Sequence, residues 1–438
     1  MSRPLTVLVA PDSFKGSLSS VEVARALATG WARARPGDTV LLAPLADGGE
    51  GTLAAIEAAG GWEPMEALVH DPLGRPVTAR WLRSADGTRA VVEMARASGL
   101  SLVPAEARDA VAATTRGTGE LVRAVLDAGI RRLTLGIGGS ATTDGGLGCL
   151  VALGAIWEAA PPNVGVAGQP DSDRLPGPTP NAGPGHLPGP APDLARVSLD
   201  GLDPRLAELE LRIACDVTNP LLGPNGAAAV YGPQKGADPR QVALLDAWLA
   251  RWADALEAAC GRSDRDTPGA GAAGGLGFGL LCLRDRLRSL ELVPGVELVM
   301  AETDLDGKLA GADLVLTGEG RIDAQTAFGK TALGVARRAL AAGLPCIAVG
   351  GGVEPEGVQA LAAVGAVVVP VAERPQSVES AMAAGSAPLE RAGERIARLV
   401  GLGAILTGHP RRTPGLDRGQ VVIHDNFDDP LPEFEEYT

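Results

Sequence analysis

The chain of 438 residues is too long for one ordinary hydrophobic core, which predicts about two domains with additional segments. Its formal net charge of −14 excludes nucleic acid and anionic membranes as main partners, because both would repel it at long range. Five scattered cysteines lack metal-binding spacing, and no apolar stretch reaches the roughly 18 residues that a membrane helix requires. We therefore expect a cytoplasmic protein with reduced thiols.

Strand and helix patterns alternate at both ends of the chain. The apolar run 5–10 predicts a strand, and residues 19–31 follow with helical periodicity, with Ser19 or Ser20 as the N-cap and Glu22 nearby. The same order recurs, with strands expected at 39–44, 313–317, 345–349 and 366–371 and helices at 52–59, 330–342 and 355–364. This alternation predicts a parallel sheet covered by helices on both faces.

Between these blocks the pattern changes, which predicts a second α/β domain inserted in the first. Residues 75–82 and 90–94 indicate an antiparallel pair around the turn Asp86-Gly87, followed by a helix at 119–127 and a strand at 132–137. We place the inserted domain at 70–294 and the discontinuous outer domain at 1–69 and 295–405. Residues 161–192, rich in Pro and Gly, predict a disordered surface loop, and 406–438 form an appended acidic tail that we also expect to be disordered.

Only four of the 39 basic residues are lysines, and three of them, Lys15, Lys235 and Lys330, stand beside glycine in segments typical of loops. The remaining 35 (39 − 4) are arginines, so a retained lysine indicates a place that requires a compact, strongly hydrated ammonium. Phosphate is the usual partner of such a point charge. Ordinary solvated lysines remain the alternative for each position taken alone.

Three strand-to-helix junctions combine small residues with charge. The segment 11–17 carries Ser13, Lys15 and Ser17 at the start of a predicted helix, which favours an anion site. Asp47 and Glu50 follow the second strand and suit Mg²⁺ or a substrate hydroxyl, and a later strand is followed by a similar segment with Glu319, Arg321 and Asp323. Such loops meet at the carboxyl ends of parallel strands, although Gly, Asp and Ser are also common in simple turns.

Further candidates lie in the middle region. The segment 138–146 follows a strand, and its glycines and hydroxyls suit close approach to phosphate. Asp216 ends another strand with Asn219 nearby, which is equally typical of a structural turn. Gly271 and Gly274 belong to a G-x-G-x-x-G match, but the polar residues before it cannot form the required strand, so it is a weak dinucleotide-binding match.

Together these motifs closely resemble the bacterial type 1 glycerate kinase family. The resemblance covers about residues 5–403 and rests on the segments 10–17, 47–52, 138–146, 215–220, 231–236 and 317–323. It implies a flavodoxin-like domain carrying an inserted α/β domain similar to restriction endonucleases, with the active site between them. It also implies ATP-dependent phosphorylation of glycerate, with (R)-glycerate giving 2-phosphoglycerate.

We assign roles to the candidates on this basis. Lys15 and Lys235 are expected to stabilise phosphate charge, Arg321 to pair with the glycerate carboxylate, and either Asp216 or Asp323 to act as the base. Asp47, Glu50 or Glu319 is expected to hold Mg²⁺. The expected ATP-binding residues are Ser13, Ser17, Gly139, Ser140, Thr142, Thr143, Lys235, Gly271 and Gly274.

Alternatives remain open at this point. One alternative is a kinase that gives 3-phosphoglycerate, and a second is a kinase that acts on another small hydroxy acid. The segment from Pro414 to Glu433 resembles the toxin-binding end of a type II antitoxin, so a third alternative is a non-catalytic protein that binds a toxin-like partner through this tail. Whether the chain forms a homo-oligomer is not decided by the sequence.

Overall fold

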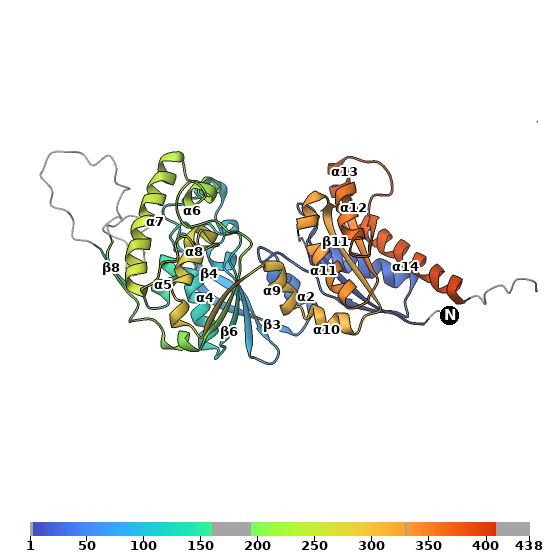
Figure 1. Ribbon diagram of the computed structural model, residues 1–438, viewed down its shortest axis with the longest axis horizontal. Helices are drawn as coiled ribbons and strands as arrows, with labels where there is room; N and C mark the ends of the chain where they lie inside the picture. Colours follow the sequence, from blue (N-terminus) through green and yellow to red (C-terminus); the bar gives the residue numbers. More distant parts are fainter. Residues whose placement is uncertain (1–2, 160–193, 329–330, 409–438) are drawn as a thin grey trace, which may run out of the picture.

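The computed structural model of the chain describes residues 3–159, 194–328 and 331–408. The expected disordered loop at 161–192, Lys330 and the antitoxin-like tail after residue 408 lie outside the described residues. Two sheets occupy two lobes that lie side by side along the long axis of the molecule (Figure 1). The α/β class expected from the sequence is therefore confirmed.

The first sheet is five-stranded and entirely parallel. Its strand order is β2-β1-β11-β12-β13, which is the 2-1-3-4-5 order of flavodoxin-like folds. In such a sheet ligands bind at the switch point, which here lies between β1 and β11. The strands are β1 (Thr6–Pro11), β2 (Thr39–Leu42), β11 (Leu314–Ile322), β12 (Cys346–Val353) and β13 (Ala366–Pro370).

Helices cover both faces of this sheet. On one face α1 (Ser20–Ala34) packs on α14 (Ala387–Gly408), and Ser19 with Glu22 forms the capping box that starts α1, as the sequence indicated. The opposite face packs against the remaining helices of this lobe. These are α2 (Thr52–Ala59), α9 (Gly295–Glu302), α10 (Leu305–Ala310), α11 (Thr331–Ala341) and α12 (Pro355–Ala362). The short α13 (Val378–Ala383) is exposed.

The second sheet is six-stranded and mixed, in the order β10-β9-β6-β5-β4-β3. β10, β9, β6 and β5 are parallel, whereas β4 pairs antiparallel with both β5 and β3. The antiparallel pair around Asp86-Gly87 is thus confirmed. The strands are β3 (Trp62–His70), β4 (Pro76–Ser84), β5 (Arg89–Glu93), β6 (Arg132–Gly136), β9 (Glu210–Ala214) and β10 (Ser289–Val293).

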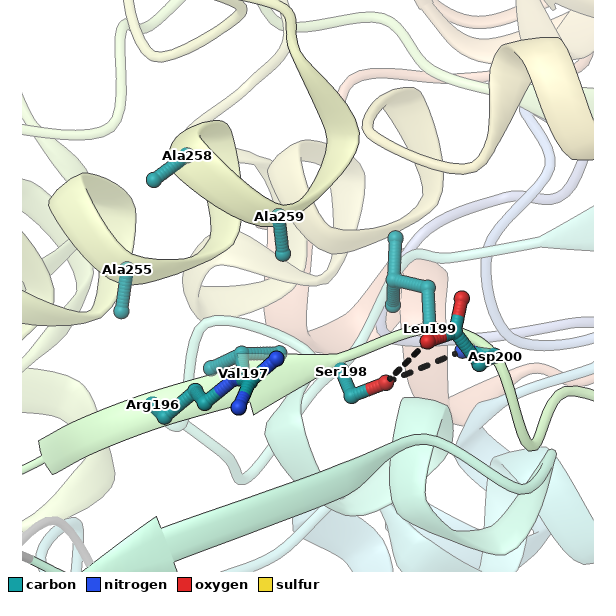
Figure 2. A pocket seen from close by; sticks show the side chains of 8 residues that line it. All are labelled: Arg196, Val197, Ser198, Leu199, Asp200, Ala255, Ala258 and Ala259. Carbon is teal, nitrogen blue, oxygen red and sulfur yellow. Dashed lines mark hydrogen bonds between the residues drawn. The ribbon is translucent and has the colours of Figure 1, made fainter.

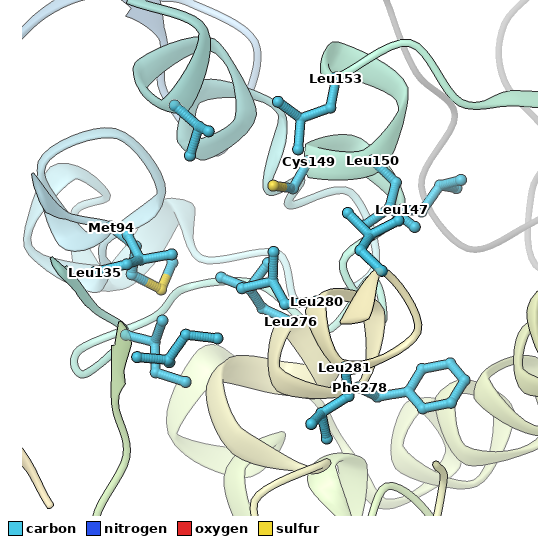
Figure 3. Close-up of a cluster of buried hydrophobic side chains, with 14 of the residues drawn as sticks. Met94, Leu135, Leu147, Cys149, Leu150, Leu153, Leu276, Phe278, Leu280 and Leu281 are labelled. Atoms are coloured by element: carbon cyan, nitrogen blue, oxygen red, sulfur yellow. The ribbon is translucent and has the colours of Figure 1, made fainter. Parts of the chain in front are cut away.

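Helices of the second lobe enclose a large apolar core, part of which is drawn in Figure 3. There Leu147 and Leu150 face Leu276 and Leu280, beside Leu135 of the sheet. The helices are α3 (Ala95–Ser98), α4 (Arg116–Asp127), α5 (Leu147–Ala152), α6 (Ala227–Tyr231), α7 (Pro239–Cys260) and α8 (Ala272–Leu281), and a two-stranded sheet pairs β7 (Ile156–Ala159) with β8 (Leu194–Ser198). None of the described helices is long and apolar enough to cross a bilayer.

Two details differ from the sequence predictions. β11 continues to Ile322, so Glu319 and Arg321 lie on a strand and not in a loop. They pair in register with Gly350 and Gly352 of β12, and this pairing extends the strand beyond its apolar part. The second sheet begins at Trp62, before the boundary placed near residue 70, because β3 pairs along its whole length with β4.

Candidate active site

The loop between β2 and α2 lies where the two lobes meet. Gly48 has a φ of +82°, and a Cβ on it would lie 2.6 Å from the Cβ of Ala214 at the end of β9. A Cβ on Gly138 would lie 2.8 Å from the Cα of Gly49. Only glycines permit these approaches, so the loop after β2 is packed directly against the carboxyl ends of β6 and β9.

This contact brings together three residues predicted from separate motifs. The ammonium of Lys15 lies 3.7 Å from the carboxylate of Asp47, and both side chains are largely exposed. Asp216, one residue beyond the start of the loop after β9, accepts a hydrogen bond of 2.9 Å from the backbone N–H of Gly295. Burial raises the pKa of Asp216, and the charge of Asp47 raises it further. An exposed cation and two interacting carboxylates therefore share one site at the junction.

Asp12 is a fourth charged group at this site, and it was not among the residues predicted from the sequence. The pKa of Asp12 is raised, chiefly by burial and to a smaller extent by the negative charge of Asp47. Hydrogen bonds from the Thr331 hydroxyl and the Ser13 N–H, and the positive charge of Lys15, act in the opposite direction. The Thr331 hydroxyl donates to Asp12 over 2.6 Å. Asp12 directly follows β1, beside β11 at the switch point of the parallel sheet. Its position immediately after a buried strand was the signal that could have identified it.

The two serines of the same loop have local backbone roles. The Ser13 N–H donates to the Asp12 carboxylate over 2.6 Å, and the Ser17 N–H donates to the Phe14 carbonyl over 2.8 Å. Helix α1 begins only at Ser20, with Ser19 as its cap. Ser13 and Ser17 therefore precede the helix in a tight turn that displays Lys15 to solvent.

A second group of predicted residues lies along the end of β11. Glu319 is buried and accepts a hydrogen bond of 2.6 Å from the Thr326 hydroxyl. The exposed Arg321 forms ion pairs with Glu354 and, at 3.5 Å, with Asp323. The predicted substrate-binding guanidinium is thus held by two carboxylates of its own lobe.

The three predicted metal ligands do not form one cluster. Glu50 acts electrostatically on Glu93, whose pKa is raised chiefly by burial, whereas Asp47 belongs to the group with Asp12 and Asp216. Across residues 3–159, 194–328 and 331–408, no three His, Cys, Asp or Glu side chains are grouped to hold a metal ion. Any metal here must take part of its ligands from a substrate or from water.

In the segment 138–146, residues 140–146 are buried, whereas Gly138 is half-buried and Gly139 is exposed. Thr142 and Thr143 have no exposed surface, and Ser140 is only 8% exposed. Lys235 is 1% exposed, and its ammonium donates to the Thr142 carbonyl over 2.5 Å. Gly139 accepts a hydrogen bond from the Leu100 N–H. Ser140, Thr142, Thr143 and Lys235 therefore lie in the interior of the second lobe. Direct contact of these residues or of Gly139 with ATP stays a prediction.

Gly271 and Gly274 have a packing role in the same region. A Cβ on Gly271 would lie 2.2 Å from the Pro220 carbonyl oxygen, and one on Gly274 would lie 1.9 Å from the Thr142 carbonyl oxygen. Close backbone contact therefore accounts for both glycines without a nucleotide.

The chain as a whole corresponds to a known family. The chain matches the model of the glycerate kinase family over residues 7–401. It belongs to the glycerate kinase family.

Individual glycerate kinase relatives are similar over most of their length. A Bacillus subtilis protein named glycerate kinase is 42% identical over 350 residues, which cover 80% of this chain and 85% of the relative. An Escherichia coli K12 protein named glycerate 2-kinase is 40% identical, with 79% and 85% covered. A crystal structure described as a glycerate kinase 2 from Salmonella typhimurium LT2 superposes with a TM-score of 0.75 at 38% identity, covering 92% of this chain and 99% of that one.

A separate cavity of about 320 Å³ lies between β8 and α7 (Figure 2). Three alanines of α7 (Ala255, Ala258 and Ala259) face the strand across it, and Ser198 bonds to Asp200 at its edge. None of its lining residues belongs to the glycerate kinase motifs. The cavity is therefore not part of the candidate active site.

Proposed function

We propose that the protein transfers the γ-phosphoryl group of ATP to the 2-hydroxyl of (R)-glycerate and releases 2-phosphoglycerate and ADP. Membership of the glycerate kinase family and 40% identity to a protein named glycerate 2-kinase support this reaction. The observation that carries it is the meeting of Lys15, Asp47 and Asp216 at the junction of the lobes. Family membership indicates glycerate as the substrate, and the geometry of the junction indicates which side chains act on it.

The residues at the junction suit phosphoryl transfer, which requires alignment, cations on the migrating group and a carboxylate for the hydroxyl proton. Lys15 is exposed and paired only over 3.7 Å, so its ammonium can exchange Asp47 for a phosphate oxygen at little cost. Asp216 is the preferred base, because its raised pKa gives its carboxylate a stronger hold on a proton. Asp323 is the alternative base and lies beside Arg321.

Arg321 is the proposed partner of the glycerate carboxylate. Its planar guanidinium suits bidentate contact with a carboxylate. In the structure it already forms ion pairs with two carboxylates, those of Glu354 and Asp323. Glycerate would therefore replace one carboxylate with another on the same exposed side chain.

The donor set at the junction fits Mg²⁺. Asp47 raises the pKa of both Asp12 and Asp216, so its carboxylate lies near enough to each of them for the two charges to repel. Protein Mg²⁺ sites commonly use one or two carboxylates together with substrate phosphates and water. Asp47 is the proposed principal ligand, and Glu50 and Glu319 remain secondary candidates. When bound, the ion would neutralise charge on the transferred phosphoryl group.

Other predictions stay open. A cytoplasmic location is still an expectation from the sequence, and the oligomeric state is still undecided. Contact of the C-terminal segment with a toxin-like partner falls outside both the described residues and the family match, which ends at residue 401.

Phosphorus NMR of the purified protein with Mg·ATP and D-glycerate tests the reaction and its position together. A 2-phosphoglycerate signal supports the proposal. A 3-phosphoglycerate signal keeps the kinase but reverses the orientation of glycerate. Intact ATP with folded protein rejects glycerate as the substrate, and a panel of small hydroxy acids then becomes the next experiment.

A further inference from the structure

Lys235 is a buried ammonium that no step of the proposed reaction uses. It ends the 3₁₀ helix Pro233–Lys235, and its Nζ donates to the Thr142 carbonyl over 2.5 Å. Burial lowers the pKa of Lys235 to about 7, and the charge of Asp144 acts in the opposite direction. Burying a charge is unfavourable unless specific partners compensate, so this lysine stabilises one particular arrangement of its neighbours.

The Thr142 carbonyl is the group that Lys235 holds. The same oxygen lies against the backbone of Gly274, where a Cβ would approach to 1.9 Å. Gly274 itself has a φ of +68°, which glycine adopts without strain. An ammonium and a close backbone contact thus define where this carbonyl lies.

The rest of the segment 138–146 is held by side chains as well as by backbone hydrogen bonds. The Trp252 indole N–H donates to the Gly145 carbonyl over 2.9 Å, and Asp144 accepts from the Thr115 N–H over 2.7 Å. The hydroxyls of Thr142 and Thr143 are buried without a hydrogen-bond partner among the described residues. These two hydroxyls therefore do not fix the conformation of the loop. The side chains of Lys235, Asp144 and Trp252 do so, together with backbone hydrogen bonds to Ser98, Leu100 and Gly274.

The beginning of the same segment reaches the active site. Gly138 lies against Gly49, and a Cβ on Gly136 would lie 2.6 Å from the Gly48 carbonyl oxygen. Gly48 and Gly49 directly follow Asp47. A displacement at Thr142 is thus only four residues away from a backbone that packs on the loop of Asp47.

We propose that Lys235 is a positioning residue, which fixes the segment 138–146 through the Thr142 carbonyl and so holds Gly138 against the active-site loop of Asp47. The inference rests on the proposed kinase function and changes the role first expected of Lys235, because a buried ammonium bonded to a carbonyl need not touch phosphate. Loss of the Lys235 ammonium should therefore weaken ATP binding more than it slows the chemical step.

Lys235→Met tests this inference, with Lys308→Met as the matched control. Lys308 is half-buried, and among the described residues its ammonium likewise donates to backbone carbonyls, those of Leu42, Ala59 and Thr303. Burial lowers its pKa as well. For Lys235→Met we expect KM for ATP to rise about tenfold, with kcat and KM for glycerate changed by less than about threefold. Amide hydrogen exchange without ligands should accelerate within 138–146 in Lys235→Met and not in Lys308→Met.

Two outcomes overturn the inference. Unchanged KM for ATP and unchanged exchange in 138–146 would leave Lys235 without a positioning role. A large fall in kcat with unchanged KM and exchange would instead place the ammonium on the transferred phosphoryl group. If Lys235→Met does not fold, Gly274→Ala displaces the same carbonyl and should give the same pattern. A wild-type protein inactive on glycerate rejects the proposed function, but the exchange experiment still decides the role of Lys235.

Discussion

Replacing Asp47 by asparagine tests the centre of the proposed active site. The substitution preserves the size of the side chain, so the packing of Gly48 against Ala214 is retained and only the charge is lost. The ion pair with Lys15 spans 3.7 Å between side chains that are 81% and 59% exposed. Exposed pairs of this kind contribute about 0–1 kcal/mol. The melting temperature should therefore change by at most about 4 °C.

Activity should respond far more than stability. If Asp47 holds the metal or orients Lys15 in the transition state, kcat/KM should fall at least about 100-fold, which corresponds to about 2.7 kcal/mol. The charge of Asp47 also contributes to the raised pKa of Asp216. Its removal lowers that pKa, so the acid limb of kcat/KM, which reports the free enzyme's base, should move to lower pH.

The assay is the initial rate of ADP formation with saturating Mg·ATP and with D-glycerate varied from well below to above its KM, across the acid and neutral range. Glu63→Gln is the control. Glu63 lies on β3, the edge strand of the second sheet, and the substitution likewise removes an exposed carboxylate from an ion pair, here with Arg83. Asp47→Asn protein with wild-type turnover would refute the proposed site. So would an activity loss that merely follows the loss of folded protein.

Further predictions concern the metal, the substrate and the packing of the first lobe. Chelation should abolish turnover without changing the circular dichroism spectrum, and excess Mg²⁺ should restore it; turnover that survives chelation contradicts the metal proposal. Arg321→Lys should raise KM for glycerate about tenfold and leave KM for ATP unchanged, because lysine lacks the planar fork, whereas the control Arg338→Lys should change neither. Gly30→Ala should lower the free energy of unfolding by about 1–3 kcal/mol in urea, since its Cβ would lie 1.8 Å from the Glu390 carbonyl oxygen on α14. Gly37→Ala, with nothing within 4 Å, should be nearly neutral, and equal effects would contradict the packing argument.

The regular alternation of the chain was enough to predict much of the first lobe. The expected helix at 52–59 coincides with α2, and the strand expected at 366–371 differs from β13 by one residue. β3 was not expected, because Pro64 and the acidic residues around it interrupt the apolar pattern. That strand lies at the edge of its sheet, where proline and charge are tolerated. The local apolar pattern therefore fails to predict a strand whose composition is permitted only by its position at the edge of the sheet.

The extension of β11 has a similar cause. Gly318 and Gly320 favour a loop when the segment is considered alone, but Gly318 packs against the Val349 carbonyl, where any Cβ would lie 2.5 Å from the oxygen. Gly318 thus serves close contact with the partner strand, and Gly320 serves close contact with the backbone of Phe14, instead of a turn. Only the partner strand, whose Val349 pairs with Gly318 at a separation of 31 residues (349 − 318), reveals which of these meanings applies.

The two site lysines show most directly what the sequence cannot decide. Lys15-Gly16 and Lys235-Gly236 have the same local pattern, with both glycines at positive φ. Lys15 is exposed beside Asp47, whereas Lys235 is buried on the Thr142 carbonyl. The difference comes from distant chain segments, since a Cβ on Gly236 would lie 2.9 Å from the Arg108 carbonyl oxygen and Thr142 is 93 residues from its lysine. A glycine beside a lysine therefore marks a backbone that must turn, and only the tertiary packing determines whether the ammonium meets a substrate or supports the loop that does.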